Sequence, residues 1–198
     1  MKSSPYQLGE NELKELSIAW IILSITFALV LNLSTSFIAE LMLILPTLGF
    51  GFICHELAHK FLAQKYGFWA EFRISYKNLL LALIMAQFGF VFAAPGAVMI
   101  FPVSRHGRRA SLEVTGRISL AGPSANLILV VIFGFLYLVS PTFPFLHSVS
   151  QIGIMLNGFL ALFNLLPISV LDGAKIFRWN KLIWGGAFLL ALLALTLV

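Results

Sequence analysis

A long and nearly continuous apolar run constrains this chain more than any other feature. It extends from Phe37 to Tyr66 and carries two histidines and a glutamate, within His55-Glu56-Leu57-Ala58-His59. As an α-helix, these roughly 30 residues would extend about 45 Å, which exceeds the ~30 Å hydrocarbon core of a bilayer. The run therefore predicts a membrane-spanning helix that tilts, kinks or projects, with Pro46 as the expected kink.

The composition is that of a membrane protein. The 198 residues are 60% hydrophobic and 11% charged, whereas a soluble domain has about 25% charged residues. We expect an all-α polytopic membrane protein with one integral domain over residues 1–198 and about five or six transmembrane helices. The net charge of +5 is attributed to basic loops rather than to a nucleic-acid partner. A single cysteine excludes an internal disulfide.

The connectors between apolar runs differ in charge. Lysine and arginine are absent from 32–36 and 140–149, but several occur in each of 65–78, 103–118 and 173–181. The positive-inside rule places the three basic connectors in the cytoplasm. The apolar run between the first two would then make no net crossing, either as a re-entrant segment or as a helix with an extended return. The alternative is an ordinary sixth span.

Alternating polarity predicts a small membrane-associated β element. Residues 69–74 alternate weakly, and residues 97–102 and 111–118 flank a basic turn. We expect the latter two segments to pair as a β-hairpin. Its edge would be able to hold an extended peptide by β-addition.

The two histidines predict a metal site. His55 and His59 are four residues apart, so on a helix they share one face and can hold one zinc ion. Glu56 lies beside that face, where its carboxylate can accept a proton from water as a general base. Catalytic zinc sites have three protein ligands, and a third is therefore required.

The sequence offers few candidates for the third ligand. Cys54 points in a neighbouring direction on the helix and is expected to pack as a small buried residue. His106 lies in a basic turn, and His147 lies in the uncharged connector on the opposite side. Asp172 shares the cytoplasmic face with His59 if the third apolar run makes no net crossing. We expect Asp172 to be the ligand, and the alternative is a helix cap.

The chain resembles the site-2 protease family of intramembrane zinc metalloproteases (peptidase family M50). The likeness rests on the motif 55–59, on Asn164-Leu165-Leu166-Pro167 followed by Leu171-Asp172-Gly173, and on Gly122-Pro123-Ser124-Ala125-Asn126. It covers residues 50–175, within an expected catalytic core of about 37–175. The resemblance implies one zinc ion per chain, held by the two histidines and the aspartate, and membrane-spanning protein substrates. It also implies that Asn164 helps to bind the reacting carbonyl.

The remaining expectations concern the role of Asn126, location and rival functions. Asn126, like Asn164, can stabilise an oxyanion, although asparagine in spans also forms helix–helix hydrogen bonds. We expect a multi-pass protein of the cell membrane, with the site toward the cytoplasmic face, partners in the bilayer and an oligomeric state left open. One alternative is a membrane metal transporter, which would need polar residues along a path across the bilayer. Another is a relative that binds client proteins without cleaving them, and the presence of Glu56 and of all three expected ligands argues against it.

Overall fold

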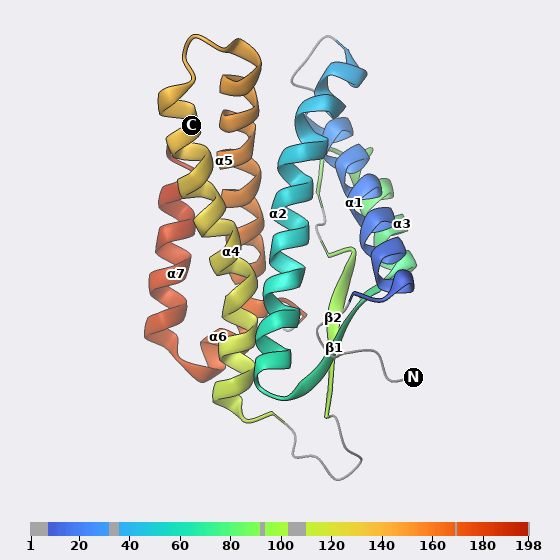
Figure 1. Cartoon of the computed structure of the whole chain (residues 1–198), viewed down its shortest axis with the longest axis vertical. Helices are drawn as coiled ribbons and strands as arrows, with labels where there is room; N and C mark the ends of the chain where they lie inside the picture. The colour runs from blue at the N-terminus through green and yellow to red at the C-terminus, as the bar shows by residue number, and fades with distance from the viewer. Residues whose placement is uncertain (1–7, 32–35, 92–93, 103–109, 169, 198) are drawn as a thin grey trace.

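The computed structural model describes residues 8–31, 36–91, 94–102, 110–168 and 170–197. Within these residues the chain forms helices and two strands (Figure 1). The elements are α1 (Glu10–Leu31), α2 (Phe37–Lys65), β1 (Phe68–Ile74), α3 (Tyr76–Ala86), β2 (Gly96–Pro102), α4 (Leu112–Val139), α5 (Pro144–Leu165), α6 (Asp172–Trp179) and α7 (Lys181–Ala194).

Helix α2 is the central element of the molecule. Helices α1 and α3 lie on one side of it, and α4, α5 and α7 lie on the other (Figure 1). The helix packs directly against α1, α4 and α5 and against both strands. The two strands and α6 lie toward the end of the molecule where α2 ends (Figure 1).

Four helices, α1, α2, α4 and α5, are long and apolar enough to cross a membrane. Helices α3 and α7 are apolar but have only 11 and 14 residues. At 1.5 Å per residue, α7 is about 21 Å long and shorter than the ~30 Å hydrocarbon core. The all-α polytopic class is confirmed, with four helices of spanning length among the described residues where five or six were expected.

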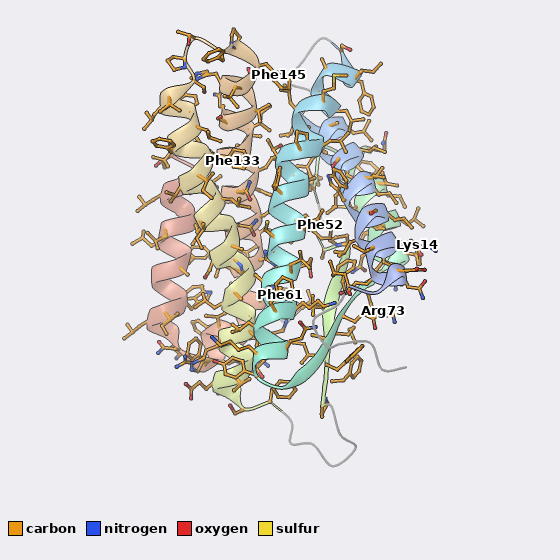
Figure 2. The ribbon with its side chains drawn as sticks, viewed as in Figure 1. Lys14, Phe52, Phe61, Arg73, Phe133 and Phe145 are labelled. Atoms are coloured by element: carbon orange, nitrogen blue, oxygen red, sulfur yellow. The ribbon has the colours of Figure 1, made fainter. Side chains whose placement is uncertain are left out.

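The outer surface of the long helices is largely apolar (Figure 2). Phe61 of α2 and Phe145 of α5 are 46% and 65% exposed, and Val131 of α4 is 72% exposed. A soluble monomer rarely exposes so much contiguous apolar surface. The surface is that of a protein surrounded by lipid.

The two strands form an antiparallel ladder that runs from Phe68 opposite Pro102 to Ile74 opposite Gly96. The chain leaves the ladder after β1, forms α3, and returns to the same end of the ladder at β2. The third apolar run therefore leaves from and returns to the same end of the ladder, with α3 as its helical part. Residues 92–93 of this run lie outside the described residues.

The predicted pairing of residues 97–102 with 111–118 is wrong. Strand β2 pairs with β1, and residues 112–118 form the first turns of α4. The Ser111 hydroxyl accepts the Val114 N–H (3.2 Å), and Glu113 pairs with Arg117 one turn later (2.8 Å). An N-cap and an i,i+4 ion pair favour a helix over the weak alternation in these residues. The basic turn with His106 lies outside the described residues.

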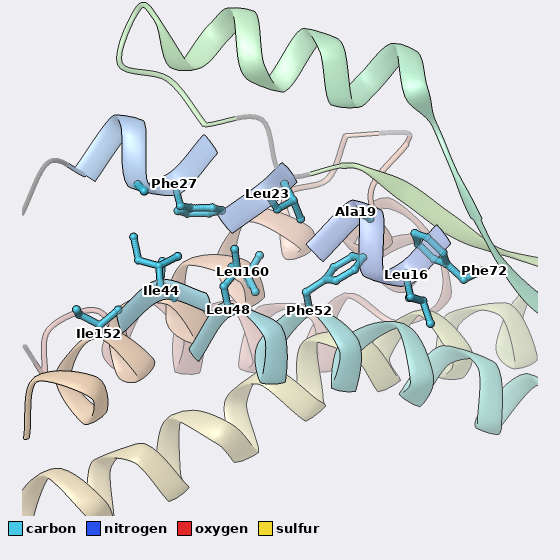
Figure 3. Packing of buried hydrophobic residues seen from close by; sticks show 12 residues of the cluster. Leu16, Ala19, Leu23, Phe27, Ile44, Leu48, Phe52, Phe72, Ile152 and Leu160 are labelled. Carbon is cyan, nitrogen blue, oxygen red and sulfur yellow. The ribbon is translucent and has the colours of Figure 1, made fainter. Parts of the chain in front are cut away.

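An apolar cluster joins the sheet to the central helix (Figure 3). Phe52 of α2 and Phe72 of β1 meet edge to face, with their ring centroids 5.7 Å apart. Both side chains are buried. Around them pack buried residues of α1, α2 and α5, which include Leu16, Leu23, Phe27, Ile44, Leu48, Ile152 and Leu160.

Candidate metal centre

Two histidines and one aspartate meet at the C-terminal part of α2. The Nε2 atoms of His55 and His59 are 3.0 Å apart. The Oδ2 atom of Asp172, the first residue of α6, lies 3.5 Å from His55 Nε2 and 2.9 Å from His59 Nε2. All three side chains are buried. Among the described residues, no other group of three or more His, Cys, Asp or Glu side chains has this geometry.

These three donor atoms fit a zinc ion. Zinc ligands at 2.0–2.1 Å in tetrahedral geometry lie about 3.3 Å from one another. The observed separations of 2.9, 3.0 and 3.5 Å bracket that value. Two imidazoles and one carboxylate also leave one tetrahedral position open, as catalytic zinc sites do.

The hydrogen bonds behind the histidines orient their free lone pairs toward this centre. His55 Nδ1 donates to Asn126 Oδ1 (2.6 Å), and His59 Nδ1 donates to the carbonyl oxygen of Ile118 (2.7 Å). Since both oxygens are acceptors, each Nδ1 carries the proton and each Nε2 presents a lone pair. Two lone pairs and a carboxylate this close together form a donor set that could hold a metal ion.

The side chain of Asn126 is held in place by hydrogen bonds from its amide NH2 group. Its Nδ2 donates to the Gly51 carbonyl and to Asn157 Oδ1, both at 3.0 Å, so its Oδ1 is the atom that faces His55. Asn126 and Asn157 are fully buried, and Asn126 is not among the residues that line the cavity at the site. The structure thus gives Asn126 contacts to His55 and to neighbouring helices. Of the two roles left open for Asn126, oxyanion stabilisation and helix–helix hydrogen bonding, these contacts are of the second kind.

Two glycines allow helices to approach the centre closely. A Cβ at Gly122 of α4 would overlap the Nε2 atoms of His55 and His59. A Cβ at Gly173 of α6 would overlap the carbonyl of Leu165 at the end of α5. Both glycines belong to the sequence motifs at Gly122–Asn126 and Leu171–Gly173, and the structure explains why larger residues do not fit there.

A cavity of about 90 Å³ opens at the metal centre. This volume holds a few water molecules. Glu56 lines the cavity, and its Oε2 atom is buried with no hydrogen-bond partner among the described residues. The other lining residues include the three metal-binding candidates, Ser119, Asn164, Lys175 and, from the sheet side, Ala94, Pro95, Gly96, Ala97, Val98 and Ile100.

The structure also places the remaining candidates. Asn164 lines the cavity, and its Nδ2 donates to the Leu160 carbonyl (2.9 Å). Cys54 is not part of the metal group and lines an apolar groove beside Trp20. His147 of α5 stacks on Tyr137 of α4, with ring centroids 4.1 Å apart.

Two residues at the site were missed from the sequence. Asn157 supports Asn126 and is an asparagine inside an apolar span, which is a signal in itself. Lys175 Nζ donates to Asp172 Oδ1 (3.3 Å), so that Oδ2 is the carboxylate oxygen left for the metal. Lys175 follows Asp172 by three residues on α6, a spacing that brings two side chains to one helix face.

Comparisons with known proteins agree with this geometry. The chain is 37% identical over 182 residues to a protein of Methanocaldococcus jannaschii named a "putative zinc metalloprotease", with 91% of each chain covered. It is 31% identical over 147 residues to YwhC of Bacillus subtilis, which bears the same description, with 66% of this chain and 65% of YwhC covered. A second M. jannaschii protein, named a zinc metalloprotease, is 28% identical over 130 residues, 64% of this chain and 30% of its own.

No protein-family model and no solved structure matches the chain. The first relative nevertheless exceeds 30% identity over nearly the full length of both chains. With its zinc-competent His55, His59 and Asp172 and its long apolar helices, this chain belongs to the family of zinc metalloproteases that these relatives represent.

Proposed function

We propose that the protein is an intramembrane metalloprotease of the site-2 type, which hydrolyses peptide bonds of membrane-spanning proteins. One observation carries the proposal. The buried carboxylate of Glu56 shares a single cavity with the three metal-binding side chains and with the edge of a β-strand. A base, a metal and a surface for an extended peptide are the parts that peptide hydrolysis needs.

The proposed mechanism assigns one role to each side chain. His55, His59 and Asp172 would hold the zinc ion, which when bound polarises a carbonyl and lowers the pKa of water. Glu56 accepts the proton of the attacking water and then delivers it to the nitrogen of the leaving amine. Asn164 lies in the same cavity, and we assign it the stabilisation of the oxyanion. We assign Asn126 the orientation of His55.

The register of the sheet supports binding of substrate in extended form. The Ser75 N–H donates to the Pro95 carbonyl (2.8 Å), so alternate pairs along the ladder are hydrogen-bonded. Gly96, Val98 and Ile100 belong to the other set, and their backbone N–H and C=O groups point away from β1. All three residues line the cavity.

A peptide added to β2 would therefore run past Glu56 and the metal centre. A transmembrane substrate must be unwound for this, because helical hydrogen bonds hide its carbonyls. Addition to the edge of a strand replaces those bonds with backbone bonds to β2.

We further propose that the site faces the cytoplasm of a cell whose plasma membrane holds the protein. Lys14 and Arg73 lie in the half of the molecule that contains the sheet, and Phe145 lies at the opposite end (Figure 2). The connector around Phe145 contains no lysine or arginine. In a Cys54→Ser background, cysteines placed at Lys77 and Lys181 should resist an impermeant reagent on intact cells, and a cysteine at Ser148 should react. Labelling of the cysteines at Lys77 and Lys181 but not of the one at Ser148 would show that the site faces the outside of the cell.

The proposed function is tested by cleavage of a membrane-spanning substrate in proteoliposomes. Glu56→Gln should keep its zinc and lose about 10²–10⁴-fold in kcat, because an amide cannot accept the proton. Glu113→Gln, which changes an exposed carboxylate on α4, is the matched control and should cleave like the wild type. Undiminished cleavage by Glu56→Gln would contradict the mechanism, and a wild-type protein that cleaves no membrane substrate would contradict the function.

A further inference from the structure

The two outer edges of the sheet are in different environments. The edge of β2 lines the cavity, whereas the edge of β1 faces α1. The Phe72 N–H donates to Glu12 Oε1 (2.9 Å), and the Ile74 N–H donates to Glu15 Oε2 (2.8 Å). Glu12 and Glu15 are three residues apart on α1 and so lie on one helix face. Two carboxylates of α1 thus occupy two successive outward N–H groups of β1.

Glu12 also connects the sheet to the helix that carries the histidines. Its Oε2 atom forms an ion pair with the Lys60 ammonium, and Lys60 directly follows His59. The two side chains are 1% and 3% exposed. A buried ion pair contributes little net stability compared with an apolar pair, and its better-attested use is to fix one arrangement of the parts that it joins. Here it fixes α1, β1 and α2 relative to one another.

Phe72 is held at both its backbone and its side chain. Glu12 accepts its N–H, and its ring packs on Phe52 of α2, which also lines the cavity. Across the ladder Phe72 is opposite Val98, whose backbone faces the cavity. Any movement of Phe72 away from α2 would therefore move the edge at Val98 relative to the metal centre.

We propose that Glu12 and Glu15 are positioning residues for proteolysis. They occupy the edge of β1, so that an extended peptide can add only to β2. Through Phe72, Glu12 also sets the distance between the β2 edge and the metal-binding side chains, and hence which peptide bond of an added substrate reaches Glu56. This inference rests on the proposed function and adds the residues that determine the site of cleavage.

The test compares Glu12→Gln and Glu15→Gln with Glu10→Gln, an exposed carboxylate on the same helix. Since Glu12→Gln removes one charge of a buried pair, the double variant Glu12→Gln/Lys60→Gln, which removes both, is measured beside it. Each protein is assayed for zinc content, for kcat and KM on a membrane-spanning substrate, and for the bonds cleaved by mass spectrometry. Hydrogen–deuterium exchange of segment 68–74 is measured without substrate.

We expect Glu12→Gln and the double variant to keep the zinc content of the wild type. Their kcat/KM should fall about tenfold, or ~1.4 kcal/mol, mainly through KM. Cleavage should spread to neighbouring bonds, and exchange at Phe72 should become faster because an amide is a weaker acceptor than a carboxylate. Glu15→Gln should act in the same direction and less strongly, since Glu15 is more exposed. A loss of folded protein alone would lower kcat without redistributing the cleaved bonds.

Cleavage at one unchanged bond with unchanged KM in Glu12→Gln and in the double variant would overturn the inference. Loss of zinc from both variants would also overturn it, because the pair would then support the metal centre rather than the substrate edge. These results differ from failure of the proposed function, in which the wild type itself cleaves no membrane substrate. In that case no cleavage register exists, and the inference falls with the function.

Discussion

The two sides of α2 differ in how they contribute to the site. On the side of α4, α5 and α6, polar groups contact the histidines directly: the side chains of Asn126 and Asp172 and the backbone carbonyl of Ile118. On the side of α1 and the sheet, an apolar cluster and backbone hydrogen bonds predominate. The first side suits a metal ion, which requires fixed donor atoms. The second suits a peptide, whose backbone is the same whatever its sequence.

This difference implies that metal binding and peptide binding can be impaired separately. Changes on the α4–α6 side should reduce the zinc content and, through it, cleavage. Changes at the sheet should alter KM and the choice of the cleaved bond while zinc stays bound. The following variants test that separation, from the largest expected effect to the smallest.

Removal of a metal-binding side chain should have the largest effect. His59→Ala and Asp172→Ala each leave two of the three protein donors, fewer than a catalytic zinc site requires. The purified variants should contain little zinc by elemental analysis, against about one ion per wild-type chain. Asp172→Ala with a full complement of zinc would remove Asp172 from the ligand set.

Asn126→Ala should weaken zinc binding without abolishing it. The variant removes the acceptor of the His55 Nδ1 proton, and loss of such a supporting group typically costs 10–100-fold in metal affinity. Competition with a chelator measures this change. Ser124→Ala on the same helix is the control and should bind zinc like the wild type. Equal zinc affinity in Asn126→Ala would show that His55 does not depend on this hydrogen bond.

Val98→Pro should have the smallest effect, and it should be on substrate alone. Proline removes an N–H that points away from β1, which an edge strand tolerates. We expect unchanged zinc and a KM about fivefold to tenfold higher, from the loss of one backbone hydrogen bond to the peptide. Met99→Pro instead removes an N–H of the ladder and should lower stability. Unchanged KM in Val98→Pro would argue against addition of the substrate to β2.

The metal centre could be predicted because its side chains belong to short sequence motifs. The i,i+4 spacing of His55 and His59 indicated a shared helix face, and elimination left Asp172 as the third donor. The structure brings these three residues together. The charges of the connectors also indicated that the third apolar run returns to the end where it began, as the β1–β2 register shows.

The sheet side was harder to predict because strand partners are set by non-local packing. Residues 97–102 were correctly predicted to form a strand, but the predicted partner was wrong. Segment 111–118 was chosen in place of β1, although residues 112–118 are part of helix α4. Strand propensity depends on packing against neighbours, which a single sequence does not specify. Glu12 contacts Phe72, which lies 60 positions away in the sequence, and Lys60, which lies 48 positions away. No local sequence pattern predicts such contacts.

The central claim is that one zinc ion is held by His55, His59 and Asp172, and zinc K-edge X-ray absorption tests it most directly. The purified protein should show a four-coordinate site with two imidazole nitrogens at about 2.0–2.1 Å and oxygen ligands at about 2.0–2.2 Å. The imidazole signal should disappear together with the zinc in His55→Ala. A sulfur ligand at about 2.3 Å, which would have to come from Cys54, the single cysteine of the chain, would contradict the account, and so would a spectrum unchanged by His55→Ala.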